Sequence, residues 1–164
     1  MQDREFATDA RSDDFVPELQ LAGRGERLGG AIIDGLILMA ILLPAMYMGG
    51  YFEGMMSGVE PGFSAKVMWT LIGFAIFTVV QGFPLANDGQ TWGKKALKMK
   101  IVDLSGNKPE FGRMLLLRYG VAQAISLVPW VGGLYFLVDS LFVFRSDKRC
   151  IHDLIAGTRV VVAR

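Results

Sequence analysis

The chain has 164 residues, of which 52% are hydrophobic, and its 17 Lys and Arg residues nearly balance its 16 Asp and Glu residues. A net charge of +1 gives no support to a nucleic-acid partner or to binding driven by overall charge. The charged residues occur in blocks separated by long uncharged stretches, as in chains that alternate between water and lipid. The sequence therefore predicts an all-α membrane protein, a multi-span helical bundle with a small cytoplasmic β element.

The first 25 residues are rich in Asp and Glu and contain no apolar core, so they match neither a signal peptide nor a transit peptide. We expect residues 1–25 to form a disordered acidic cytoplasmic tail, because such a segment has little apolar surface to bury. The transmembrane domain is expected to occupy residues 26–164.

Two membrane spans are expected over residues 28–48 and 67–85. The first contains one ionised residue, Asp34, and the second contains no charge and ends before the turn-forming segment Asn87–Gly89. At about 1.5 Å per helical residue, each stretch is long enough to cross a hydrocarbon core of roughly 30 Å.

The third apolar region, residues 111–144, crosses the membrane once or twice, because the segment Pro129–Gly133 interrupts it. The distribution of Lys and Arg favours two crossings, over residues 111–128 and 130–144, with both termini in the cytoplasm. We therefore favour four spans, with a cytoplasmic tail over 145–164, and keep three as the alternative. The basic residues on the expected cytoplasmic side are Arg4, Arg11, Arg24 and Arg27, then Lys94, Lys95, Lys98, Lys100, Lys108 and Arg113, and finally Arg145, Lys148, Arg149, Arg159 and Arg164.

Two short segments have the pattern of β-strands. Residues 97–103 alternate apolar and charged positions and precede a turn at 105–107. The β-branched residues of 158–162 follow Gly157, which can end a helical turn over 148–156. If both segments are cytoplasmic, we expect them to pair.

An aspartate inside the hydrocarbon costs about 2.5–3.5 kcal/mol, so Asp34 is expected to have a partner. Arg27 lies about two helical turns earlier on the same face, and Arg118 is a second candidate. Asp34 either binds a proton or cation in a polar path or forms an ion pair that holds helices together. Asp139 would join such a path if it faced Asp34, and otherwise lies at the interface near Arg145.

The C-terminal pair His152 and Asp153 has the spacing of an ordinary amphipathic turn, in which Asp153 can pair with Arg149. We expect His152 to form hydrogen bonds rather than to bind a metal. Cys150 is expected to be a reduced, space-filling thiol. The sequence thus predicts neither a metal site nor a cofactor. An enzyme is not expected either, since no base accompanies Ser64, Ser126 or Ser140.

A series of short motifs, in this order and spacing, resembles the RDD family of bacterial membrane proteins over nearly the whole chain after about residue 22. The motifs are Arg27-Leu28, Ile33-Asp34, Thr91-Trp92-Gly93-Lys94, Ile101-Val102-Asp103 with Gly106, Arg118, and residues 152–158 from His152 to Thr158. The family is named after one arginine and two aspartates, which correspond here to Arg27, Asp34 and Asp153. Gly29 and Gly30 depart from the bulkier residues usual after the first motif.

The resemblance implies a location in the bacterial cytoplasmic membrane, and transport, including Na⁺/H⁺ exchange, is proposed for some members. It makes Asp153 a candidate cytoplasmic gate, or the partner of an arginine at the base of the helices. Two functions stay open. In the first, the chain is a small cation or proton transporter, and it forms an oligomer because three or four helices are barely enough to enclose a polar path. In the second, it is a non-transporting component that assembles with a second copy or another membrane protein, and its buried charges fix the pairing of helices.

Overall fold

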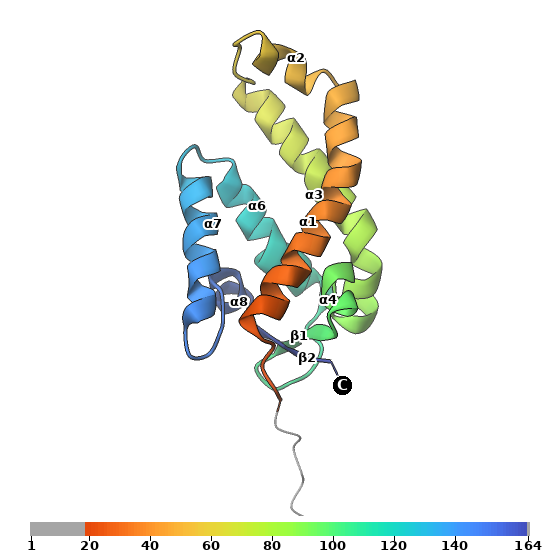
Figure 1. The fold of residues 1–164 in the computed structure, drawn as a ribbon, viewed down its shortest axis with the longest axis vertical. Helices are drawn as coiled ribbons and strands as arrows, with labels where there is room; N and C mark the ends of the chain where they lie inside the picture. Colours follow the sequence, from red (N-terminus) through yellow and green to blue (C-terminus); the bar gives the residue numbers. More distant parts are fainter. Residues whose placement is uncertain (1–18, 164) are drawn as a thin grey trace, which may run out of the picture.

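The computed structural model describes residues 19–163, which form two long helices, a shorter helical hairpin and a small mixed α/β base (Figure 1). The long helices α1 (Arg24–Met48) and α3 (Phe63–Asp88) are joined at the end far from the base by α2 (Tyr51–Met56). Among the described residues, α1 and α3 are the helices long and apolar enough to cross a membrane.

Both long helices extend beyond the apolar stretches expected from sequence. α1 begins four residues earlier than predicted, and its first residue, Arg24, donates hydrogen bonds to the carbonyl groups of Val143 and Phe144. α3 continues to Asp88 and ends where Gly89 adopts a left-handed conformation (φ 65°). The length of the apolar stretch therefore underestimates the length of each helix, because the helix continues into polar residues at its end.

The third apolar region folds into a helical hairpin. Its first arm is a continuous helical segment, with α5 (Phe111–Arg113), the π-helical η1 (Met114–Gly120) and α6 (Val121–Ser126). The chain turns at Pro129 and Trp130, where Trp130 has a positive φ of 65°, and returns through α7 (Val131–Leu141) and the 3₁₀ turn η2 (Phe142–Phe144). The predicted interruption thus marks a reversal of direction. Residues 131–144 are apolar but shorter than α1 and α3.

The predicted strand pairing is confirmed. β1 (Met99–Asp103) pairs antiparallel with β2 (Thr158–Val162), and Ile101 lies opposite Val160. β2 follows α8 (Ile151–Ala156), which ends at Gly157 with a left-handed φ of 63°, as the sequence indicates.

The expected N-terminal tail needs a correction over its last residues. Residues 1–18 lie outside the described part of the chain, but Leu21 forms a β-bridge with Val161, and Ala22 is fully buried. The amide of Ala22 donates to the carbonyl of Val160, at 3.1 Å. Because hydrogen bonds and burial fix this segment, the ordered domain begins before residue 26.

The buried core lies at the base, beside the ends of the long helices, where α4 (Trp92–Ala96) also packs. It combines residues from the N-terminal segment, α3, both strands and η1: Ala22, Leu85, Met99, Ile101, Met114 and Val160. This core places the polar residues of the family motifs at the same end of the molecule.

Candidate functional site

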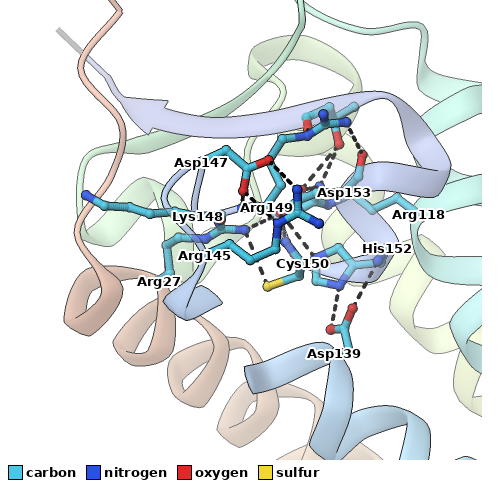
Figure 2. A network of polar contacts seen from close by, with 11 residues as sticks. Arg27, Arg118, Asp139, Arg145, Asp147, Lys148, Arg149, Cys150, His152 and Asp153 are labelled. Atoms are coloured by element: carbon cyan, nitrogen blue, oxygen red, sulfur yellow. Dashed lines mark hydrogen bonds and ion pairs between the residues drawn. The ribbon is translucent and has the colours of Figure 1, made fainter. Parts of the chain in front are cut away.

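The C-terminal aspartate of the motifs lies at the centre of an ionic group at the base, which we call the Asp153 cluster (Figure 2). Asp153 is fully buried, and its two carboxylate oxygens pair with the guanidinium groups of Arg118 and Arg27. The backbone amide of Cys150 and the Thr158 hydroxyl also donate to the carboxylate, at 3.1 and 3.3 Å. One carboxylate thus joins α1, η1 and the C-terminal segment.

Local sequence accounts for the position of Asp153. It lies in the first turn of α8, where its carboxylate accepts the otherwise unpaired amide of the preceding cap residue, Cys150. Burial alone would raise the pKa of Asp153, but the guanidinium of Arg118, with His152 and Arg27, holds that pKa well below its usual value. The group is therefore an ion held by opposite charges.

The two arginines reach Asp153 from different helices. Arg27, near the start of α1, also donates to the carbonyl of Lys148. Arg118 is 2% exposed, lies in the π-helical η1, and donates to the Thr158 hydroxyl at 2.7 Å. A π-helical segment is rare and commonly occurs at functional sites. Together these contacts tie the C-terminal segment to both halves of the helical part.

Asp34 belongs to a second buried group, the Asp34 cluster, formed with Gln81, Thr91, Gly93 and Lys94. Its Oδ1 accepts hydrogen bonds from Gln81 Nε2 at 2.9 Å and from the amide of Gly93 at 2.7 Å. Its Oδ2 accepts from Thr91 Oγ1 at 2.5 Å and lies 4.0 Å from Lys94 Nζ. Asp34 therefore anchors the start of α4 to α1 and α3.

A close approach of two glycines makes this anchoring possible. A Cβ atom on Gly30 would lie 2.8 Å from Met99 Cε, and one on Gly93 would lie 2.9 Å from Asp34 Cγ and collide with the Gly30 backbone. A larger residue at position 93 would push α4 away from α1, whereas one at position 30 would first displace the end of the Met99 side chain in β1. The Gly30 of this chain, which departs from the usual motif, thus fits the contact between these helices.

A third contact joins the hairpin to the C-terminal segment. His152 donates its backbone amide to Asp139 Oδ1 at 2.9 Å, and its ring Nδ1 lies 2.7 Å from Asp139 Oδ2. Burial and the Arg118 charge lower the pKa of His152, and burial raises the pKa of the neighbouring Cys150 thiol to about 11. Ligand atoms of Asp139, Cys150 and His152 lie within 4.8 Å of one another.

Comparison with known proteins gives the family. The RDD family model matches residues 21–157, which is most of the chain. The chain belongs to the RDD family. With the two candidate spans, this membership indicates a membrane protein.

Two bacterial relatives of this RDD protein are similar over most of their length. An "Uncharacterized protein" of Haemophilus influenzae is 26% identical over 152 residues, covering 92% of this chain and 84% of the relative. "Uncharacterized protein YckC" of Bacillus subtilis is 30% identical over 144 residues, covering 87% and 85%. No solved structure matches the chain.

The structure corrects the pairing predicted for this RDD protein. Neither Arg27 nor Arg118 contacts Asp34, because both arginines pair with Asp153. The expected link between Asp153 and an arginine is therefore present, and it involves two arginines. Asp139 does not face Asp34, because its carboxylate is bound by His152.

Two further expectations need correction. Arg149 donates to the backbone carbonyl of Asp153, not to its carboxylate, and Arg145 pairs with Asp147. His152 forms hydrogen bonds as expected, but Cys150 and His152 also lie beside Asp139 as a possible ligand group.

Sequence reasoning missed the partners of Asp34. Gln81 gave a usable signal, since it is a polar residue inside an otherwise apolar stretch and so needs a partner at that depth. Thr91 gave a second one, because it caps the N-terminus of α4, and its side chain accepts from the Lys94 amide. The backbone amide of Gly93 gave no signal, because any residue carries that donor.

Proposed function

We propose that this RDD protein is a non-transporting membrane component that assembles with a second copy or another membrane protein, and that its buried charges fix the arrangement of its helices. The observation that carries the proposal is the internal pairing of Arg27, Asp34 and Asp153, the three residues that name the family. Charges that are satisfied within the chain stabilise one helix arrangement, and breaking such a pair is strongly destabilising.

The surroundings of Asp34 support a structural role. Three donors hold its carboxylate, and two of them come from the start of α4, namely its cap residue Thr91 and Gly93. A carboxylate that passes ions along a path must exchange partners, whereas this one closes a network between three helices. Two cavities of about 340 and 210 Å³ lie between the long helices and the hairpin, and Asp34 lines neither.

The exposed surface supports assembly within a membrane. α1 and α3 carry large apolar side chains that are more than half exposed, including Leu28, Leu36, Leu71, Val79 and Phe83. In water such a surface would be unfavourable, whereas lipid or a partner helix covers it without cost. The two cavities lie between this pair of helices, α1 and α3, and the hairpin.

We further propose four spans, with both termini on the cytoplasmic side of the bacterial inner membrane. Residues 20–22 pair with β2, so the start of α1 and the C-terminal strand lie at one end of the molecule. The basic residues of the central and C-terminal segments lie there too, in agreement with the excess of Lys and Arg in cytoplasmic loops. Reporter fusions at each terminus would test the orientation.

Transport of a cation or proton is the second candidate. It is favoured by the polar side chains of Lys66, Thr70, Gln123 and Ser126, which line the larger cavity between the helices. In this case the flux would pass through that cavity, and the path would have to extend beyond it to reach Asp34.

One experiment separates the two candidates. Everted vesicles with the parent chain, Asp34→Asn, or the exposed control Asp88→Asn are compared for cation-driven proton movement and for folded protein per vesicle. The assembly proposal predicts no flux from any of them and reduced folded protein for Asp34→Asn alone. Flux from the parent would overturn it, and an inactive Asp34→Asn that is folded to the same level, beside an active control, would place Asp34 on the transport path.

A further inference from the structure

The side chains of Asp139, Cys150 and His152, all of types that can bind metals, converge where α7 meets the start of α8, beside the Asp153 cluster (Figure 2). Asp139 and Cys150 are 8% and 7% exposed, and His152 contacts both the hairpin and the C-terminal segment. We propose that Asp139, Cys150 and His152 bind a divalent transition-metal ion, with Zn²⁺ preferred. This site is independent of the assembly role proposed above.

The ligand types define the class of ion. Thiolate sulfur, imidazole nitrogen and carboxylate oxygen are the three ligand types of zinc sites. Calcium and magnesium ions prefer oxygen ligands throughout, so this group selects against them. Three protein ligands leave one tetrahedral position open to water, and the site thus resembles those zinc centres that exchange a ligand.

The histidine is already oriented for metal binding. Its Nδ1 lies 2.7 Å from Asp139 Oδ2, and its Nε2 lies 3.9 Å from Asp153 Oδ2. When Nδ1 binds the metal, the ring proton remains on Nε2 and faces the Asp153 carboxylate. At 3.9 Å this carboxylate is within ion-pair distance but beyond hydrogen-bond distance, so it would act on the metal-bound imidazole through its charge.

The charges balance when the metal binds. The thiol of Cys150 loses its proton to water, and the resulting thiolate and Asp139 together carry the two negative charges that neutralise the dication. Arg27 Nη2 lies 3.8 Å from Cys150 Sγ and can donate to the thiolate, while Arg27 and Arg118 keep Asp153 as their own counter-ion. The metal ion and its three ligands would therefore be neutral overall, so no uncompensated charge is placed in this buried region.

The ligands need only a small adjustment. Tetrahedral zinc places its nitrogen, oxygen and sulfur ligands about 3.3–3.8 Å apart. Separations of up to 4.8 Å would therefore shorten by about 1 Å, and the 2.7 Å between His152 Nδ1 and Asp139 Oδ2 would widen by about 0.6 Å. Tyr135, one helical turn before Asp139, has a buried hydroxyl with no hydrogen-bond partner among the described residues. This hydroxyl lies on the side of α7 that carries Asp139, where it can bond to a water ligand of the metal.

Cobalt titration tests the site directly, with the full chain in lipid nanodiscs and without a polyhistidine tag. Cys150 is the sole cysteine of the sequence, so a thiolate-to-cobalt charge-transfer band can only come from this residue. We expect the parent chain to develop the band with one equivalent of Co²⁺ and to lose it when Zn²⁺ is added. A parent spectrum without the band would overturn the proposal, and this result requires no variant.

Substitutions then identify the ligands. Cys150→Ser should abolish the band, and both Cys150→Ser and His152→Gln should weaken Zn²⁺ binding at least about 10-fold, because even outer-shell changes cost that much. Asp147→Asn, a partly exposed acid of the same segment, is the matched control and should bind as the parent does. Unchanged Zn²⁺ affinity in folded Cys150→Ser and His152→Gln would reject these residues as the ligands.

Discussion

Different interactions stabilise the two ends of the molecule. At the base, buried core residues surround two ionic clusters, so that α1, α3, the hairpin and the C-terminal segment are all joined by hydrogen bonds. At the far end, α2 has no buried residue, and the helices there enclose the larger cavity. The difference shows that buried polar contacts hold the base, whereas the described residues of the far end include no buried polar or charged side chain.

The largest effect is expected for Asp153→Asn. The change removes the charge that two buried arginines share and should lower the free energy of unfolding by about 3–5 kcal/mol. Equilibrium unfolding of the purified chain measures this loss, with Asp147→Asn as the control. A loss below about 1 kcal/mol would mean that water or another residue replaces the carboxylate.

Acid should weaken the same contact less than the substitution does. In the folded chain the pKa of Asp153 lies below its usual value, whereas in the unfolded chain it returns to about 3.9. The stabilisation is therefore complete above about pH 4 and is lost as the pH falls toward the folded pKa. Unfolding of metal-free protein between pH 6 and pH 3 should show a decline that Asp153→Asn lacks. Parallel declines in both chains would assign the effect to other groups.

A smaller loss is expected from Gly93→Ala. The added Cβ would meet Asp34 Cγ at 2.9 Å and the Gly30 backbone, and overpacking of this kind costs about 1–3 kcal/mol. Gly25→Ala is the control, because a Cβ there meets no atom within 4 Å. If both variants unfold like the parent, α4 can move away from α1 without penalty, and the Asp34 cluster does not tie them tightly.

The smallest effect is expected at the far end, for Glu60→Gln. Glu60 is 92% exposed and lies 3.8 Å from Lys66, and exposed ion pairs of this kind contribute at most about 1 kcal/mol. Its unfolding midpoint should match that of the parent within error. A loss as large as that of Gly93→Ala would contradict the contrast between the two ends.

At the base, sequence reasoning predicted the strands correctly but not the partners of the charged side chains. The alternation of apolar and charged residues over 97–103, the turn after it and the β-branched run that follows Gly157 were enough to predict β1, β2 and, with both segments on the cytoplasmic side, their pairing. The partners of the charges could not be read from spacing along one helix. Arg27 and Asp34 share a face of α1, yet each binds a residue far away in the chain.

The possible metal ligands show the same limit. Cys150 and His152 are close in sequence, but Asp139 joins them only because the hairpin returns α7 to the start of α8. A pattern confined to one segment contains too few ligands to indicate such a site. The π-helical turn at Arg118 has no sequence signal that we recognise.

Amide hydrogen exchange of the parent chain and Asp153→Asn tests the central claim most directly, namely that the buried charges hold the base. We expect strong protection at Ile101 and Val161 in the parent, faster exchange across β1, β2 and α8 in the variant, and unchanged exchange in α2. Equal protection of the base in both chains would contradict the claim, because the Asp153 cluster would then contribute nothing to its stability.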